Sequence, residues 1–353
     1  MEPILAFTIV MFIWTIGEFV SNKSKALISM MLVASLIFLV GFATDLLPHD
    51  LIQDSGLLGL GNAVIGVIIV HLGTMMSFKD LKLQWKTFVV GSLTVVLMTV
   101  ILIFIGELIF DRNIAVAGTA SITGGTLSIL MVQEKVNEIQ NAGGDLGILS
   151  SYLLAVFPLL ILNLKNLVGF LFTANILKKE ALRVKKQYRD GELTFFEQEV
   201  AENTTEAKES ILPDFLRTPY GTLFLLGLTM YVSRFLSQLT NGTVNAFVIA
   251  LLLGIILRHF RILKPNALSS TDSFGLLMIS IMVIAFGPLA DIVPADLLHL
   301  IGPIAFYLAA GLGIIFIASF LIGKKVGYSG SLSIAVGMTT LFGFPGTMVL
   351  TKE

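Results

Sequence analysis

The chain contains no cysteine and few charged residues. Of its 353 residues, 13% are Asp, Glu, Lys or Arg, whereas soluble domains carry roughly 25%. Hydrophobic residues make up 55% of the chain, and its mean hydropathy is +0.90. The lack of cysteine excludes disulfides and thiolate metal sites. The shortage of charge predicts an all-α polytopic membrane protein, which has the lipid bilayer as its surroundings.

The chain also lacks an excess of either charge and any common catalytic motif. Its 23 basic and 24 acidic residues leave a net charge of −1, which argues against a nucleic-acid partner. Its four histidines, His49, His71, His259 and His299, are too scattered to suggest a ligand cluster. No His-Glu-x-x-His, Gly-x-Ser-x-Gly or Asp-rich metal motif occurs in the sequence. We therefore expect no enzyme activity and no cofactor.

Apolar runs recur along the whole chain, and a membrane span needs about 20 apolar residues. In the first half, 1–173, we predict spans at 3–20, 26–47, 56–77, 86–110 and 146–173. In the second half, 218–353, we predict spans at 219–238, 244–258, 273–291 and 298–322. The polar stretch 174–217 separates the halves, and we predict that it is a cytoplasmic linker.

Two further apolar segments are interrupted by glycine or proline. Segment 114–133 contains Thr123-Gly124-Gly125-Thr126, and segment 329–351 contains Gly343-Phe344-Pro345-Gly346. Gly and Pro destabilise a helix interior. Broken backbone survives at membrane depth only where protein or a water-filled cavity satisfies its polar groups. Paired breaks at corresponding places in two halves indicate the binding site of a transporter.

The distribution of Lys and Arg predicts how these segments lie. The turn 111–113 has one basic residue and is expected outside. The strongly basic and amphipathic stretch 178–189 is expected to form a helix at the cytoplasmic lipid surface. An odd number of crossings must join them, yet two apolar segments lie between. We therefore predict that 114–133 is a re-entrant hairpin, and by the same logic that 329–351 is another. The two halves then form an inverted repeat in the inner or plasma membrane of a cell.

The hydroxyls and glycines of the two hairpins are the candidate site. Close helix packing is the alternative role for each single residue. Half-helix N-termini attract carboxylates, and unwound carbonyls with hydroxyls suit Na⁺. The predicted substrate-binding residues are Ser121, Thr123, Gly124, Gly125, Thr126, Gly343, Pro345, Gly346 and Thr347. The predicted Na⁺-binding residues are Thr119, Ser128, Thr339, Thr340 and Asn62.

The acidic residues nearest the spans, Glu18, Asp45, Glu107 and Asp291, all lie toward span ends. This placement disfavours a proton antiporter that works through a buried carboxylate.

On Thr123-Gly124-Gly125-Thr126, Gly343-Phe344-Pro345-Gly346 and the order of its spans, the chain resembles the glutamate:sodium symporter family and the related 2-hydroxycarboxylate transporters. The resemblance implies two inverted halves, each of about five transmembrane helices and a Gly-rich re-entrant hairpin. It also implies an elevator-type, Na⁺-coupled secondary transporter that forms a homodimer. The first hairpin is followed by a span whereas the second ends the chain, so we expect a final helix beyond Glu353.

The leading functional hypothesis is Na⁺-coupled symport of a small anionic or zwitterionic substrate, an organic anion or an amino acid such as glutamate. An exporter or cation antiporter on the same fold is the second hypothesis, and it predicts activity without a Na⁺ requirement. A membrane scaffold that does not transport is the third, and it would not need paired helix breaks. The sequence leaves the choice between dicarboxylate and amino-acid substrates open.

Overall fold

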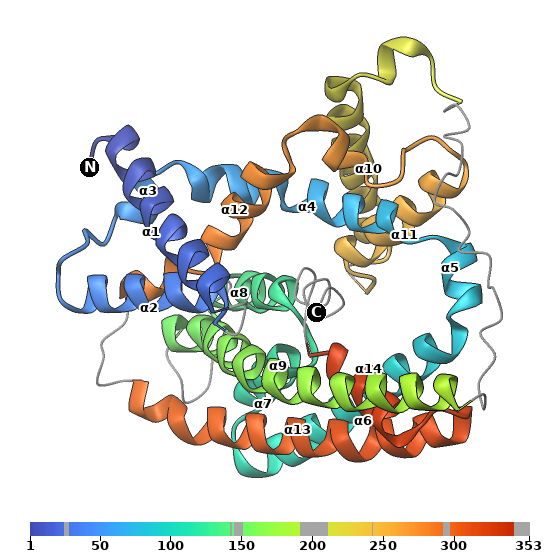
Figure 1. The fold of residues 1–353 in the computed structure, drawn as a ribbon. Coiled ribbons are helices and arrows are strands. Elements are labelled where there is room, and N and C mark those ends of the chain that lie inside the picture. Colours follow the sequence, from blue (N-terminus) through green and yellow to red (C-terminus); the bar gives the residue numbers. More distant parts are fainter. Residues whose placement is uncertain are drawn as a thin grey trace. The chain divides into compact units, whose positions relative to one another are not determined.

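A computed structural model describes residues 1–24, 28–141, 143–144, 151–190, 211–241, 243–291 and 297–341 (Figure 1). In these ranges the regular structure is helical throughout. Among the described residues, six helices are long and apolar enough to cross a membrane: α1 (Pro3–Lys23), α4 (Leu57–Met75), α6 (Trp85–Ile109), α10 (Pro219–Leu239), α12 with the turn η3 (Phe274–Asp291) and α13 (Leu298–Val326). This confirms the prediction of an all-α polytopic membrane protein.

The remaining elements are shorter or more polar. They are α2 (Met30–Ala43), α3 (Leu51–Asp54), α5 (Phe78–Leu83), α7 (Arg112–Thr123), α8 (Thr126–Asn141), α9 (Ser151–Arg189), α11 (Ala246–His259), α14 (Gly330–Thr339) and the 3₁₀ turns η1 (Asp214–Leu216) and η2 (Ala267–Thr271). Polar caps fix several starting points. The Ser29 hydroxyl accepts from the Leu32 amide at 3.1 Å, and the Asn245 side chain accepts from the Phe247 amide at 2.8 Å. These caps set the starts of α2 and α11, which begin later than the predicted spans 26–47 and 244–258.

Helix α9 continues beyond the predicted span 146–173 and ends at Arg189. Its second part is rich in Lys, Arg, Ala, Leu and Glu, all of which favour helix. Residues 174–189 of the predicted linker are therefore helical. The inside or outside placement of this segment stays a prediction.

The chain divides into two compact units. Unit 1 comprises Met1–Gly56, Lys86–Leu193 and Ala285–Glu353, and unit 2 comprises Leu57–Trp85 and Thr194–Ile284. Each unit combines segments from both predicted halves. The division into halves at 1–173 and 218–353 stays a prediction from the sequence.

Within each unit, a helix pair from one predicted half packs against a segment of the other half. In unit 1, α1 packs on α2, and α2 packs on η3. In unit 2, α10 packs on α11, and both pack on α4. The first two helices of each half therefore contact the third apolar element of the opposite half.

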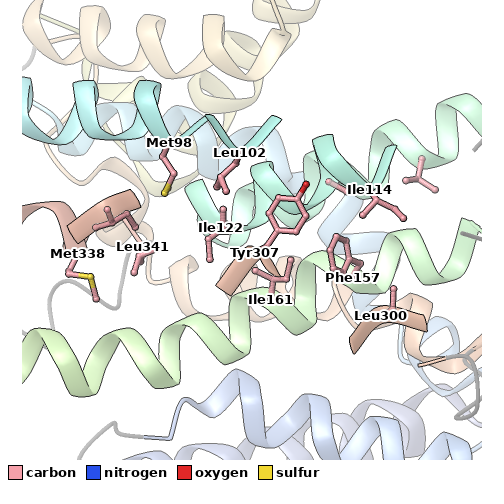
Figure 2. Packing of buried hydrophobic residues seen from close by; sticks show 13 residues of the cluster. Met98, Leu102, Ile114, Ile122, Phe157, Ile161, Leu300, Tyr307, Met338 and Leu341 are labelled. Carbon is pink, nitrogen blue, oxygen red and sulfur yellow. The ribbon is translucent and has the colours of Figure 1, made fainter. Parts of the chain in front are cut away.

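The core of unit 1 joins the two interrupted segments (Figure 2). Buried apolar side chains from six helices and from the turn after α14 form one cluster, which we call the shared core. Its members are Met98, Leu102, Ile114, Ala117, Ile122, Val136, Phe157, Ile161, Leu300, Tyr307, Ile315, Met338 and Leu341. Ile122 lies at the end of α7, and Met338 lies in the last turn of α14. Both segments that the sequence singled out are thus anchored in the same core.

Unit 2 is held together by close helix crossings. A Cβ added to Gly73 of α4 would lie 2.9 Å from the Gly254 Cα of α11, so the two backbones touch at this point. A Cβ on Gly61 would lie 2.8 Å from the Ser280 carbonyl carbon of α12. Small residues allow membrane helices to approach in this way.

Large apolar side chains are exposed along several long helices. Phe12 and Phe19 on α1, Phe104 on α6 and Tyr231 on α10 are each more than 60% exposed. A soluble protein rarely exposes so much apolar surface. These faces fit contact with lipid.

Candidate functional site

The predicted interruption at Gly124–Gly125 is present. Helix α7 begins after Asp111, whose carboxylate accepts from the Ile114 amide at 2.9 Å. It ends at Thr123, because Gly124 has an extended backbone with φ −107° and ψ 176°. Helix α8 then begins at Thr126. We call residues 121–126 the α7–α8 break. Its assignment as a re-entrant hairpin tip stays a prediction.

Hydroxyl groups surround the α7–α8 break, and most donate to their own helix. The Thr123 hydroxyl donates to the Thr119 carbonyl oxygen at 2.7 Å, and the buried Ser121 hydroxyl donates to that of Ala117. The Ser128 hydroxyl donates to the Gly125 carbonyl oxygen at 2.6 Å. The hydroxyl hydrogens of Ser121, Thr123 and Ser128 are therefore engaged in hydrogen bonds to the backbone. The lone pairs of the hydroxyl oxygens can still accept from a ligand or coordinate a cation.

A buried lysine from α9 reaches the α7–α8 break. The Lys165 side chain is fully buried. Its Nζ donates to the carbonyl oxygens of Ser121 at 2.6 Å, of Ile122 at 3.2 Å and of Gly124. These carbonyls belong to the end of α7, where the helix leaves its last acceptors unpaired. Lys165 thus satisfies the backbone that the glycines release.

The partners of the Lys165 ammonium are backbone carbonyl oxygens, which carry a partial negative charge, and not a carboxylate. Across the part of the chain that the structure describes, no Asp or Glu oxygen lies within 4.0 Å of its Nζ. An ammonium has three N–H donors and a neutral amine has two, so three acceptors match the ammonium form. The C-terminal end of a helix also favours a cation.

Tyr307 of α13 fixes the middle of α7. Its side chain is fully buried, and its hydroxyl donates to the Ala115 carbonyl oxygen at 3.3 Å. A Cβ on Gly118 would lie 2.6 Å from the Tyr307 Cδ2 atom and closer still to the neighbouring ring carbon, so glycine is needed for this contact. The buried Thr119 side chain lies next to the Tyr307 hydroxyl. Thr119, a predicted Na⁺ ligand, is therefore part of the α7–α13 contact.

Two buried amide side chains connect α8 and α9 to their neighbours. Gln133 of α8 donates through Nε2 to the carbonyl oxygens of Ala155 at 3.1 Å and Ala285 at 3.4 Å. Asn163 of α9 donates to the Ser35 hydroxyl of α2 at 2.9 Å. These bonds hold unit 1 together around the α7–α8 break.

The second interrupted segment is described as far as Leu341. Helix α14 packs on both α13 and α9. The Thr339 and Thr340 hydroxyls near its end donate to the carbonyl oxygens of Val336 at 2.7 Å and Gly337 at 2.6 Å. Four of the predicted substrate-binding residues lie outside the described residues: Gly343, Pro345, Gly346 and Thr347.

The remaining predicted ligands are placed as follows. Thr126 is the first residue of α8, at the α7–α8 break. Asn62 lies on α4 in unit 2, with its side chain exposed. The structure thus brings Thr119, Ser121, Thr123, Gly124, Gly125 and Ser128 together at one place in unit 1.

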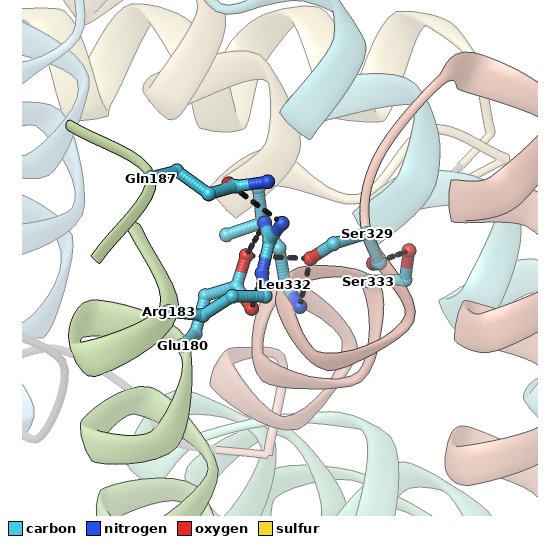
Figure 3. Close-up of polar contacts among 6 residues, drawn as sticks. All are labelled: Glu180, Arg183, Gln187, Ser329, Leu332 and Ser333. Atoms are coloured by element: carbon cyan, nitrogen blue, oxygen red, sulfur yellow. Dashed lines mark hydrogen bonds and ion pairs between the residues drawn. The ribbon is translucent and has the colours of Figure 1, made fainter. Parts of the chain in front are cut away.

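A polar contact holds the start of α14 to the second part of α9 (Figure 3). The Ser329 hydroxyl, which caps α14, donates to the Glu180 carboxylate at 2.6 Å. Arg183 donates to the same carboxylate at 2.6 and 3.0 Å. The Arg183 hydrogen bonds, with that of Ser329, lower the pKa of Glu180 below its ordinary value. We call this group the Glu180 contact.

Three side chains around the α7–α8 break, Lys165, Tyr307 and Gln133, are not among the site residues predicted from the sequence. For Lys165 a signal was present, because it is a lone charge within the predicted span 146–173, and ionisable residues inside a membrane are costly and commonly functional. Tyr307 and Gln133 carry no comparable signal, because their roles depend on which helices meet.

Comparisons with known proteins do not assign the chain to a family. Neither a scan against protein-family models nor a search of curated proteins finds a match. The resemblance to the glutamate:sodium symporter family therefore stays a prediction from the motifs. Among the described residues, no group of three or more His, Asp or Glu side chains gathers as a metal site.

Proposed function

We propose that the chain is a secondary active transporter for a small organic anion or an amino acid, with Na⁺ as the coupling ion. The α7–α8 break and the end of α14 carry the binding site, and the unit that contains them moves during transport. The observation that carries the proposal is the α7–α8 break itself, a helix interrupted in a buried position and anchored in the same core as α14. An interrupted helix of this kind supplies backbone groups for substrate and ion.

Two further observations support the proposal. Each compact unit combines segments from both halves of the chain, and the helix pairs α1–α2 and α10–α11 each pack on an element of the opposite half. An inverted repeat would produce such an exchange of segments. A division into two units also fits an elevator mechanism, in which one unit carries the site and the other stays fixed, with a homodimer as the expected assembly.

The first test is a thermal-shift screen of the purified protein with amino acids and small carboxylates, each with Na⁺ and with K⁺. A ligand that binds only the folded state stabilises that state by mass action and so raises Tm. At a ligand concentration a hundredfold above Kd, the free energy of unfolding rises by about 2.7 kcal/mol. We expect a Na⁺-dependent rise that is lost in Thr123→Val. Gly313→Ala is the control, because a Cβ at Gly313 of α13 would meet nothing within 4 Å. A ligand whose effect is the same in Thr123→Val would contradict the proposed site.

Lys165 favours a second candidate, an exporter or antiporter that does not require Na⁺. Its ammonium already occupies three carbonyl oxygens at the α7–α8 break. The same screen separates the two, because this candidate predicts equal ligand effects in Na⁺ and in K⁺.

A further inference from the structure

The carbonyl oxygens at the end of α7 form a set of ligands for a monovalent cation. Three of them, from Ser121, Ile122 and Gly124, converge on one point, the Lys165 Nζ. Convergent backbone carbonyls can replace part of the hydration shell of an alkali cation. In this chain the Lys165 ammonium lies where the three carbonyl oxygens converge, so the cation at this place is a side chain of the protein.

The way in which Lys165 is bonded argues against direct contact with an anionic substrate. Its three N–H donors are matched by three carbonyl oxygens, so no donor is left for a carboxylate. An anion would have to take donors away from carbonyls that are buried and need them. Lys165 is therefore a positioning residue for the α7–α8 break.

We propose that Lys165 is a resident cation, which occupies the place at the α7–α8 break that Na⁺ or another small monovalent cation would otherwise take. This end of α7 is then held in its broken form without a bound metal ion. A coupling Na⁺ would then bind through other groups of the proposed site, and not at these three carbonyl oxygens. The meaning for transport rests on the proposed function, whereas the cation chemistry of the α7–α8 break can be tested without any transport assay.

The test removes the ammonium and asks whether a free cation replaces it. Tm of the purified full chain is measured in NaCl, methylammonium chloride and N-methyl-D-glucamine chloride at equal ionic strength, for the wild type and for Lys165→Ala. We expect Lys165→Ala to have a lower Tm in N-methyl-D-glucamine. We expect Na⁺ or methylammonium to raise its Tm by about 5 °C more than that of the wild type. An equal response of the two proteins to each cation would overturn the proposal.

Lys165→Met is the matched control, because an apolar chain of similar length fills the space and leaves no room for a cation. It should be destabilised without selective recovery in Na⁺ or methylammonium. A recovery of Lys165→Met equal to that of Lys165→Ala would place the responding cation elsewhere and also overturn the proposal.

A second variant covers the case in which Lys165→Ala does not fold. The chain has no native cysteine, so Lys165→Cys carries a unique thiol. The unfolded protein is treated with 2-bromoethylamine, which restores an ammonium at nearly the length of lysine, or with iodoacetamide, which adds a neutral group. Refolding into detergent should recover monodisperse protein after the first reagent, and clearly less after the second in any of the three salts, because the neutral group fills the space without supplying a charge. Equal recovery after both reagents in N-methyl-D-glucamine, or no recovery after either, would contradict a role for the charge.

Discussion

In unit 2, glycine brings α4 and α11 into backbone contact without interrupting either helix, whereas in unit 1 glycine ends α7 inside the protein. Buried side chains follow the same difference. In unit 2, the Leu268 amide of the η2 turn donates to His71 Nδ1 at 3.1 Å, and the Ala267 amide donates to the Thr74 hydroxyl oxygen at 3.2 Å. The acceptors of the η2 turn are therefore neutral side chains of α4. The α7–α8 break of unit 1 is met by the charged Lys165. At the η2 turn and at the Gly73–Gly254 crossing, unit 2 is held by neutral groups and direct packing. Unit 1 instead places a charge where its helix is interrupted.

This difference indicates different uses of the two units. Neutral hydrogen bonds and backbone contacts suit a part that keeps one structure. A broken helix that depends on a single ammonium suits a part that handles ions or charged substrates. Four substitutions test this comparison, and they follow here from the largest expected effect to the smallest.

Gly73→Leu should have the largest effect. The new side chain would collide with the Leu251 carbonyl oxygen and the Gly254 Cα, which are backbone atoms and cannot turn away. We expect a loss of about 3 kcal/mol or more, or no folded protein. The control is Gly59→Leu on the same helix, where a Cβ would meet nothing within 4 Å. Denaturant unfolding in detergent measures the free energy of unfolding of both variants. Equal values would contradict the claim that the backbone contact between α4 and α11 at Gly73 holds unit 2 together.

Gly124→Ala tests the α7–α8 break. Its Cβ would lie 2.9 Å from the Ala120 carbonyl oxygen and 2.6 Å from the Ser128 hydroxyl, so α8 would have to shift away from α7. We expect a loss of about 1–3 kcal/mol and the loss of any ligand-dependent rise in Tm. Gly313→Ala should leave both quantities unchanged. A full ligand response in Gly124→Ala would show that the α7–α8 break is not the binding site.

His71→Leu tests the neutral contact in unit 2. It removes the acceptor of the Leu268 amide and leaves that donor buried, which should cost about 1–3 kcal/mol. His71→Asn keeps an acceptor near the same position and should lose clearly less. Neither variant should alter the response of Tm to Na⁺ or to a transported ligand. A change in that response would mean that unit 2 also takes part in binding.

Glu180→Gln should have the smallest effect and a defined pH dependence. The pKa of Glu180 is lowered in the folded protein, chiefly by Arg183, so its charge stabilises the fold above the ordinary value of 4.5. That contribution is lost as the pH falls below 4.5 through the lowered pKa. We expect the wild type to be more stable than Glu180→Gln by about 1 kcal/mol at neutral pH. The two unfolding curves should converge in acid, and a constant difference from neutral to acidic pH would contradict the assigned charge.

The sequence predicted the elements that depend on local composition. The spans follow from apolar runs, and the end of α7 follows from Gly124–Gly125, because a helix loses stability at consecutive glycines. The helical form of 178–189 was predicted as well, and in the structure this stretch continues α9 to Arg189. Local sequence is sufficient wherever one segment decides its own structure.

Contacts between distant segments were beyond such a prediction. The shared core depends on how α7, α13 and α14 pack, and Tyr307 belongs to it only because Gly118 leaves room for its ring. Lys165 stands out in the sequence as a charge, but its carbonyl partners become known only when α9 is placed beside α7. Periodicity and composition carry no information on such pairings.

Helix α9 runs without interruption from Lys165 to Glu180, about 22 Å at 1.5 Å per residue. At 100° per residue, the two side chains lie about 60° apart around the helix axis, and thus on similar sides. One contacts the end of α7, and the other contacts the start of α14. Both interrupted segments are therefore bonded to one continuous helix, on similar sides of it and about 22 Å apart. A substitution that displaces α9 should consequently disturb the end of α7 and the start of α14 in the same protein.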